Sequence, residues 1–144
     1  MLETWGLTAA VFLPVVGAGI IALTPKRNEK AIKFFSLVFS GLPLLLGILL
    51  IGPFSGHRGG SGMRLQVNAP WIPSINARYH VGIDGISLPL LELTLLVTFL
   101  CMIYSLWHVP EPHNPKGFLA LCLVLETGMA GTFIALDLVL FFIF

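Results

Sequence analysis

The sequence predicts an all-α polytopic membrane protein with four transmembrane helices, the start of a fifth, and a short β-hairpin on the outer side. Of the 144 residues, 56% are hydrophobic and only 10% are charged, whereas a soluble domain carries about 25% charged residues. The charged residues also gather between long apolar runs of the length that a bilayer core requires. These two observations exclude a water-soluble domain, and we expect residues 1–144 to form one membrane domain.

The first two apolar runs cover residues 5–23 and 34–54, and each contains a central proline, Pro14 or Pro43. A proline inside a membrane helix frees a backbone carbonyl and bends the helix. Only Glu3 precedes the first run, whereas a signal peptide would carry positive charge there. We therefore expect two retained membrane helices.

The polar stretch between the second and third apolar runs, residues 55–85, predicts the hairpin. Residues 63–68 alternate apolar and polar side chains as a half-buried strand does, and residues 77–83 alternate less regularly. Trp71 and Tyr79 suit the aromatic belt at a membrane surface. A short β-hairpin lying on the membrane is the predicted structure.

The third and fourth membrane helices are expected over residues 86–107 and 117–135, with a proline-rich loop between them. Residues 138–144 are again apolar and are interpreted as the start of a fifth helix. Seven residues cannot cross a bilayer, and a helix ending within lipid leaves backbone carbonyls without partners. We accordingly interpret the sequence as an amino-terminal fragment.

The distribution of Lys and Arg predicts the orientation, because cytoplasmic loops are enriched in these residues. An outside amino terminus places five of them on the cytoplasmic side and three on the hairpin side. The five are Lys26, Arg27, Lys30, Lys33 and Lys116, and the three are Arg58, Arg64 and Arg78. The hairpin is therefore expected outside.

Two glutamates within the apolar runs are candidates for a proton path. An ionised carboxylate at the bilayer centre costs about 2.5–3.5 kcal/mol on insertion scales. Glu126 comes nine residues after Gly117, about 13 Å into its helix, and Glu92 is shallower. Glu126 is expected to be protonated, paired or in contact with a hydrated interior. The sequence leaves open whether it relays protons or is a neutral, hydrogen-bonded part of the helix bundle.

Two aspartates stand where helices begin and are predicted to be structural. Asp84 precedes the third membrane helix, and Asp137 precedes the fifth. Free backbone amides and the helix dipole favour a carboxylate at such a position. Each is expected to cap its helix.

The remaining reactive side chains predict no catalytic nucleophile, no cofactor and no metal site in this chain. Cys101 and Cys122 fall within membrane helices without CxxC spacing, and the four histidines (57, 80, 108 and 113) fall in loops or the hairpin. The sequence contains no glycine-rich phosphate loop and no serine, histidine and acid pattern. The net charge of +1, without a long basic run, indicates no nucleic-acid partner.

Two stretches resemble the antiporter-like membrane subunits of respiratory complex I, NADH:quinone oxidoreductase, with subunit M, also called chain 4, the nearest. One comprises Trp71-Ile72-Pro73 and Tyr79-His80-Val81-Gly82-Ile83-Asp84-Gly85-Ile86-Ser87-Leu88. The other comprises Gly128-Met129, Gly131, Phe133, Ala135, Asp137-Leu138, Leu140-Phe141 and Phe144. Together they cover about a third of the chain, and neither follows from hydrophobicity alone.

The resemblance implies a much longer protein that translocates protons and has no redox centre of its own. It implies as partners the lipid bilayer, protons and other membrane subunits of complex I, with quinone and NADH bound by other subunits. It also implies an energy-transducing membrane, most simply the bacterial plasma membrane. The family's central glutamate would fall just beyond Phe144. Glu126 and Glu92 are not assigned to the family pattern, so their candidacy rests on their expected burial alone.

Two other functions remain open at this point. A subunit of a multisubunit sodium/proton antiporter would share the helix pattern and the intramembrane acids. A non-transporting membrane scaffold would use those acids structurally.

Overall fold

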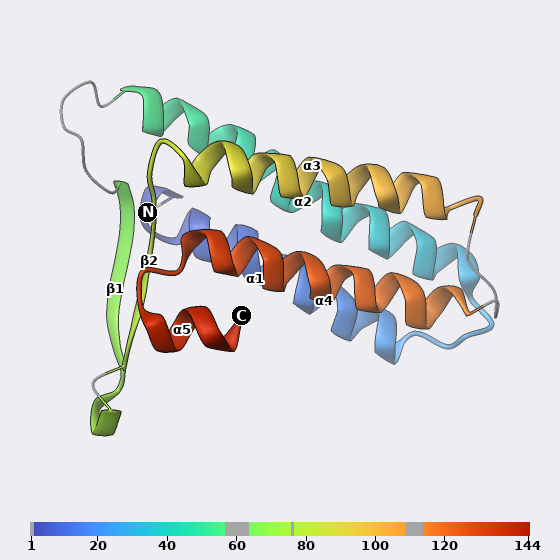
Figure 1. The fold of residues 1–144 in the computed structure, drawn as a ribbon. Coiled ribbons are helices and arrows are strands. Elements are labelled where there is room, and N and C mark those ends of the chain that lie inside the picture. The colour runs from blue at the N-terminus through green and yellow to red at the C-terminus, as the bar shows by residue number, and fades with distance from the viewer. Residues whose placement is uncertain (1, 57–63, 76, 109–113) are drawn as a thin grey trace.

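Four long helices lie side by side, and a two-stranded sheet crosses one end of the bundle (Figure 1). The computed structural model describes residues 2–56, 64–75, 77–108 and 114–144. The long helices are α1 (Leu2–Leu23), α2 (Glu29–Gly56), α3 (Ser87–Ser105) and α4 (Pro115–Ile134). The sheet consists of β1 (Arg64–Ile72) and β2 (Ala77–Ile83), joined through the 3-10 turn η1 (Pro73–Ile75), and the short helix α5 (Leu138–Ile143) follows α4.

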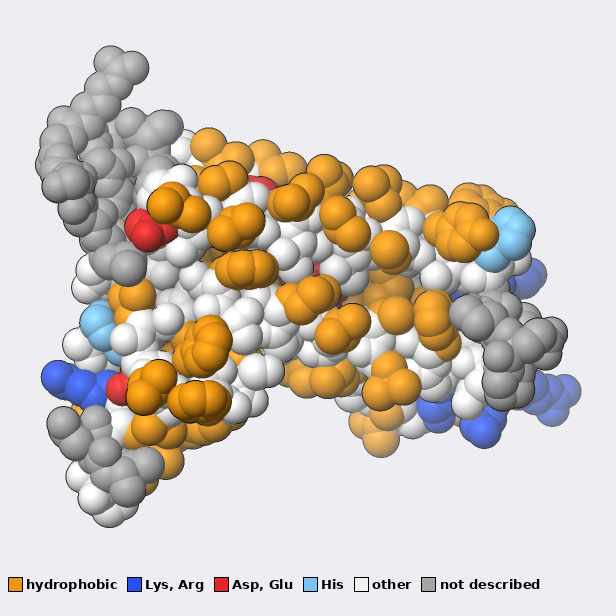
Figure 2. All heavy atoms as spheres, viewed as in Figure 1, with side chains coloured by type: hydrophobic (Ala, Val, Ile, Leu, Met, Phe, Trp, Pro, Cys, Tyr) orange, Lys and Arg blue, Asp and Glu red, His pale blue; other side chains and the backbone are white. Residues whose placement is uncertain are grey.

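Within the described residues, four helices are long and apolar enough to cross a membrane. The spans are Trp5–Leu23, Glu29–Gly52, Ser87–Ser105 and Pro115–Ile134. On the face shown in Figure 2, hydrophobic side chains are spread along the length of the bundle, and the Lys and Arg side chains in view lie at its two ends. The predicted fold class, a polytopic α-helical membrane protein with a short hairpin, is confirmed. The side of the membrane on which the hairpin lies stays a prediction.

Helix α2 begins at Glu29, five residues before the expected start of the second apolar run. Hydrophobicity marks the part of a helix that lies in lipid, and a helix continues beyond that part when its first turn is solvated. Glu29 in the first turn also suits the helix dipole. Lys33, one turn further on, donates from Nζ to the carbonyl of Leu106 at 2.7 Å. This cation therefore stabilises the carboxyl-terminal end of α3.

Helix α4 begins at Pro115, two residues before the expected residue 117. The side chain of Asn114 accepts a hydrogen bond from the amide of Gly117 at 3.3 Å. Proline suits the first helical position because the amide that it lacks would have no partner there. Local capping by Asn114 thus sets the start of α4, whereas the sequence analysis began the helix after the charged residue Lys116.

The strands β1 and β2 pair antiparallel, with Val67 opposite Val81 and Pro70 opposite Arg78. Strand β2 has the predicted bounds, whereas β1 extends to Ile72 instead of ending at residue 68. The extension passes through Pro70, which lacks an amide. It is tolerated because, among the described residues, β1 pairs with β2 alone and is an edge strand. The register is irregular on both sides of the paired segment from Val67 to Pro70.

Strand β2 fastens the hairpin to the helix bundle. The amide of Leu136, between α4 and α5, donates to the carbonyl of His80 at 2.9 Å. The hydroxyl of Tyr79 donates to Thr8 Oγ1 of α1 at 3.0 Å. Tyr79 therefore contacts the bundle and is half-buried, whereas Trp71 is 46% exposed and remains suited to a membrane surface.

Glycines allow close approach between neighbouring helices. A methyl group on Gly17 of α1 would lie 2.3 Å from Cβ of Phe39 in α2. On α2, Gly41 faces the ring of Phe99, and Gly47 faces the carboxyl group of Glu92, both on α3. Membrane helices associate by such packing, since lipid is as apolar as their own side chains.

The buried apolar side chains form two separate clusters. One lies toward the hairpin and includes Val11, Leu95 and Ala130. The other lies toward the α1–α2 loop and includes Ala18, Met102 and Leu123. Each of α1, α3 and α4 contributes to both clusters, so the apolar core is interrupted at about the middle of the bundle.

Candidate functional site

Glu126 lies on the buried face of α4 and is 0% exposed. Its neighbours on that face include Leu119, Leu123 and Ala130, at the three- and four-residue spacing of one helical stripe. Helix α4 packs against α1, α2 and α3. Glu126 is eight residues before the end of α4, about 12 Å from that end by helical rise. The carboxyl group therefore lies inside the bundle at the depth of the bilayer interior.

Neither carboxyl oxygen of Glu126 has a hydrogen-bond partner among the described residues. The same holds for the hydroxyl of the adjacent Thr127, which is also buried. Buried polar groups in folded proteins are nearly always bonded, to protein or to ordered water. Glu126 and Thr127 therefore form a buried polar site. The described protein atoms make no hydrogen bond to its three side-chain oxygens.

Glu126 and Thr127 lie where the apolar core is interrupted. On α4, Leu123 belongs to one apolar cluster and Ala130 to the other, with the two polar residues between them. On α3, buried Thr98 stands in the same way between Leu95 and Met102. On α2, the buried serines Ser36 and Ser40 both fall between Ile32 and Leu50, the members of the two clusters on that helix, and Ser40 is the nearer to the midpoint. We call Ser40, Thr98, Glu126 and Thr127 the polar belt.

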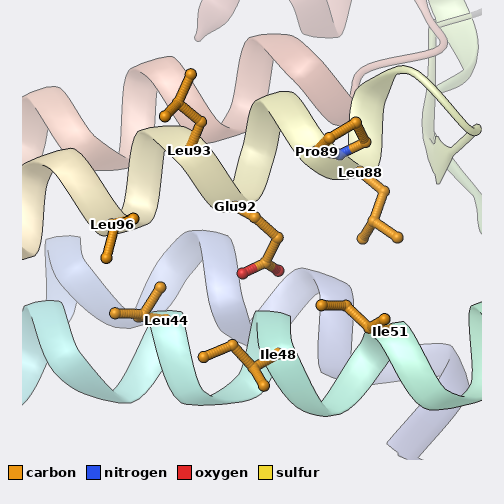
Figure 3. A pocket seen from close by; sticks show the side chains of 8 residues that line it. All are labelled: Leu44, Ile48, Ile51, Leu88, Pro89, Glu92, Leu93 and Leu96. Atoms are coloured by element: carbon orange, nitrogen blue, oxygen red, sulfur yellow. The ribbon is translucent and has the colours of Figure 1, made fainter.

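Glu92 occupies a different setting from Glu126. It lies five residues into α3, about 8 Å from the start of the helix, and its carboxyl group points toward α2 (Figure 3). It lines a groove of about 490 Å³ between the two helices, and Glu126 is not among the lining residues. Oε1 of Glu92 is buried and has no hydrogen-bond partner within the described ranges. The structure thus places the two predicted proton-path residues in separate surroundings.

Asp84 and Asp137 both accept hydrogen bonds from backbone amides, but only Asp137 is the N-cap of its helix. The N-cap residue of α3 is Ile86, so the expectation that Asp84 caps that helix is wrong; Asp84 lies two residues earlier, in the turn that leads into α3. Asp84 Oδ1 accepts from the amides of Ile86 at 2.9 Å and Ser87 at 2.6 Å. These bonds, that from Ser87 foremost, hold the pKa of Asp84 below its ordinary value.

Asp137 is the N-cap of α5, where Oδ1 accepts from the amides of Val139 at 2.8 Å and Leu140 at 3.3 Å. Its Oδ2 accepts from the amide of Arg78 in β2 at 3.2 Å. The bond from Arg78 is the main reason that the pKa of Asp137 lies below its ordinary value. Asp137 therefore joins the hairpin to the start of α5.

The cysteines and the described histidines form no reactive cluster. Cys101 and Cys122 are free thiols. His80 Nε2 lies 3.4 Å from Oε1 of Gln66, and His108 stacks on Tyr104 with ring centroids 4.8 Å apart. In the part of the chain that the structure describes, no three His, Cys, Asp or Glu side chains are grouped as a metal site requires. His57 and His113 lie outside the described residues.

The polar belt was missed by sequence analysis except for Glu126. Small hydroxyl side chains in an apolar helix can bond to their own helix, as Ser40 does to the carbonyl of Leu37 at 3.4 Å, so their presence alone signals nothing. Thr127 beside Glu126 was the available clue. The alignment of Thr98 and Ser40 with them depends on how three helices pack.

The fold and this site define the class of protein: a multi-pass membrane protein of packed helices with a carboxylic acid enclosed at mid-bundle. Comparison with known proteins then shows which membrane proteins this chain resembles. The chain is 34% identical over 139 residues to NAD(P)H-quinone oxidoreductase chain 4 1 of Picosynechococcus sp. and 36% identical over 139 residues to chain 4-2 of Synechocystis sp.. It is 34% identical over 140 residues to the chloroplastic chain 4 of Mesostigma viride.

These similarities cover 95% of this chain and about a quarter of each relative, between 24% and 26%. The resemblance to chain 4 that the motifs predicted is confirmed. No protein-family model matches the chain.

Proposed function

We propose that this chain is part of a proton-translocating membrane-arm subunit of an NADH:quinone oxidoreductase. It would couple quinone reduction elsewhere in the complex to proton transfer, with NADH and quinone bound by other subunits. The names of its relatives support a quinone oxidoreductase over a multisubunit sodium/proton antiporter. In this proposal the chain contributes neither a redox centre nor a catalytic nucleophile.

The observation that carries the proton-transfer role is the enclosed, unbonded carboxyl group of Glu126. A structural acid in a scaffold would have its oxygens satisfied by protein donors, since an unsatisfied buried polar group is costly. Glu126 has no such donor among the described residues. The carboxyl oxygens of Glu126 are then available to bond water or to bind and release a proton, as the proton-transfer role requires.

The polar belt supplies the surroundings that such a proton needs. A buried water forms about three hydrogen bonds to otherwise unsatisfied polar groups. The free hydroxyl of Thr127 lies next to Glu126 on the same helix, and Thr98 and Ser40 interrupt the apolar core on neighbouring helices. We infer that water enters the bundle at this belt and connects Glu126 to the rest of the proton path. Glu92 is the second proton-path candidate.

The proposed location is an energy-transducing membrane, the plasma membrane in a bacterium, with the amino terminus and the hairpin outside. The distribution of basic residues supports this orientation. Of the described Lys and Arg residues, five lie in the α1–α2 loop or near the first turn of α2 or α4, at the end opposite the hairpin, and two lie in the hairpin. The five are Lys26, Arg27, Lys30, Lys33 and Lys116, and the two are Arg64 and Arg78.

The test is proton pumping per electron in vesicles that contain the intact complex. Glu126→Gln keeps the shape and hydrogen-bonding capacity of the side chain but cannot carry the proton. We expect the complex to assemble and the ratio of protons pumped to electrons transferred to fall. Glu29→Gln, the same change at an exposed position at the start of α2, should leave that ratio unchanged. A wild-type ratio and turnover in Glu126→Gln would refute the role of Glu126.

A further inference from the structure

We propose that water and protons reach Glu126 from the end of the bundle that carries the α1–α2 loop, along a line of buried hydroxyl groups on α2 and α3, and that apolar side chains close the opposite, hairpin end. The hydroxyl line consists of Ser36, Ser40, Thr98 and Ser105. A proton that arrives breaks one O–H bond of a hydrated proton and forms one O–H bond on the carboxylate of Glu126, leaving water. The inference rests on the proposed function and names the direction from which Glu126 receives its proton.

Buried polar side chains are confined to one part of the bundle. Among the described residues, they are those of the hydroxyl line together with Glu126 and Thr127. Ser36 follows the start of α2 by two turns, and Ser105 is the last residue of α3. Both of these helix ends lie at the loop end of the bundle (Figure 1). The buried polar groups therefore run from the loop end as far as Glu126 and Thr127.

The hydroxyl line faces the interior of the bundle. Ser36 and Ser40 are one turn apart on α2, and Thr98 and Ser105 are two turns apart on α3, so each pair lies on one face of its helix. All four side chains are buried. Helices α2, α3 and α4 pack against one another in all three pairs. The buried faces of α2 and α3 therefore adjoin the face of α4 that carries Glu126.

The hydroxyls of the line can bind water while they remain bonded to their own helices. Ser36 Oγ donates to the carbonyl of Lys33 at 2.8 Å, and Ser105 Oγ donates to that of Cys101 at 2.7 Å. A hydroxyl oxygen also has two acceptor lone pairs, which can take hydrogen bonds from water. Ser36 and Ser40 are about 6 Å apart along α2, and one water spans about 5.5 Å between two bonded oxygens. A short file of water therefore suffices to join neighbouring hydroxyls.

Apolar side chains separate Glu126 from the hairpin. About 12 Å of α4 lies between Glu126 and Ile134, and the buried side chains of Ala130 and Ile134 belong to the apolar cluster toward the hairpin. The same cluster takes in side chains of α1, α2, α3 and both strands. Glu92 lies on this side as well, but it opens to the groove between α2 and α3, whose lining does not include Glu126. Water has no comparable line of buried polar partners on the hairpin side among the described residues.

The experiment measures how fast silver ions reach single cysteines in an otherwise cysteine-free full-length protein, in native membrane vesicles that contain the intact complex. Silver travels in water and not in lipid, and it binds thiolates. Ser36→Cys and Thr98→Cys place the thiol on the hydroxyl line, and Leu91→Cys places it at a buried position two turns nearer the hairpin on the helix of Thr98. Asn28→Cys in the α1–α2 loop and Ser74→Cys in η1 report which end faces the added silver. The test is therefore independent of the proposed orientation.

We expect silver at the loop end to modify Ser36→Cys and Thr98→Cys several-fold faster than silver at the hairpin end, and Leu91→Cys to stay unmodified from either end. Equal rates from the two ends, faster reaction from the hairpin end, reaction of Leu91→Cys at the rate of Thr98→Cys, or failure of either hydroxyl-line probe to react would overturn the proposal. None of these outcomes measures pumping. A wild-type pumping ratio in Glu126→Gln would refute the proposed function and would leave the measured access unchanged.

Removal of one hydroxyl provides a second readout at Glu126 itself. Thr98→Val keeps the shape of the side chain and removes its hydroxyl. Thr94→Val is the matched control on the same helix, because the hydroxyl of Thr94 is exposed and bonds the carbonyl of Leu90 outside the line. In a protein with Glu126→Cys, Thr98→Val should slow modification by silver from the loop end several-fold, and Thr94→Val should leave it unchanged. Equal slowing in both variants, or none in Thr98→Val, would contradict the role of Thr98.

Discussion

The contact between Gly17 and Phe39 makes the packing of α1 on α2 open to a quantitative test. The change is Gly17→Ala, which adds one methyl group. That methyl would lie 2.3 Å from Cβ and 2.5 Å from Cγ of Phe39. Cβ is fixed to the backbone, so rotation of the ring does not remove the clash. Since ordinary contact begins at 3.4 Å, one helix must move by about 1 Å relative to the other.

Such overpacking costs about 1–3 kcal/mol. Gly19→Ala is the matched control, because a methyl group there has no atom of the described residues within 4 Å. Both changes receive the same gain in helix propensity, about 1 kcal/mol in water, so the difference between the two variants isolates the contact. We expect Gly17→Ala to be less stable than Gly19→Ala by about 1–3 kcal/mol.

The assay is reversible unfolding of the full-length protein in mixed micelles, with the free energy of unfolding measured as the fraction of denaturing detergent rises. Equal free energies of unfolding for the two variants would refute the described α1–α2 packing. A loss for Gly19→Ala alone would show that α1 presents a different face to α2.

Two further predictions concern the hairpin. In a cysteine-free protein, an impermeant maleimide applied from outside should label Ser74→Cys in η1 and not Asn28→Cys, and the opposite pattern would contradict the proposed orientation. Asp137→Ala should speed hydrogen exchange at the amide of Arg78, which loses its acceptor. Because the pKa of Asp137 is lowered, its contribution is complete above the ordinary value of 3.8 and is lost only as pH falls through the lowered one. Corrected for intrinsic exchange, wild-type protection at Arg78 should therefore be constant from about pH 5 to pH 8, and a loss in that range would contradict the assignment.

Hydropathy and alternation were sufficient to predict the helices and β2, but they could not place every boundary. The start of α2 at Glu29 lies in a charged stretch, where helix formation depends on solvation and capping more than on hydrophobicity. The extension of β1 through Pro70 depends on pairing with β2, which a local pattern does not contain. Sequence analysis thus missed boundaries of two kinds: those set by local capping and solvation, as at the starts of α2 and α4, and that set by a partner strand, as at the end of β1.

The candidate site shows the same division. The burial of Glu126 could be predicted because an acid interrupts an apolar run. That none of the described residues bonds its carboxyl group could not be predicted, because this depends on the side chains of α1, α2 and α3 that surround it. Tyr79 also differs from its prediction. An amphipathic tyrosine side chain suits a membrane surface, yet the hydroxyl of Tyr79 donates a hydrogen bond to Thr8 within the protein.

Strand β2 is connected to α1, to the start of α3 and to the end of α4. Tyr79 contacts α1, His80 bonds the turn between α4 and α5, and the chain leaves Ile83 directly for the start of α3. A strand advances about 3.3 Å per residue and reverses the facing of its side chains at each step. Inserting or deleting one residue in β2 would therefore alter the relative depth of these helices and turn Tyr79 away from Thr8. The short strand at this end of the bundle thereby fixes how deep α1, α3 and α4 lie relative to one another, and with it the relative levels of Thr98 on α3 and Glu126 on α4.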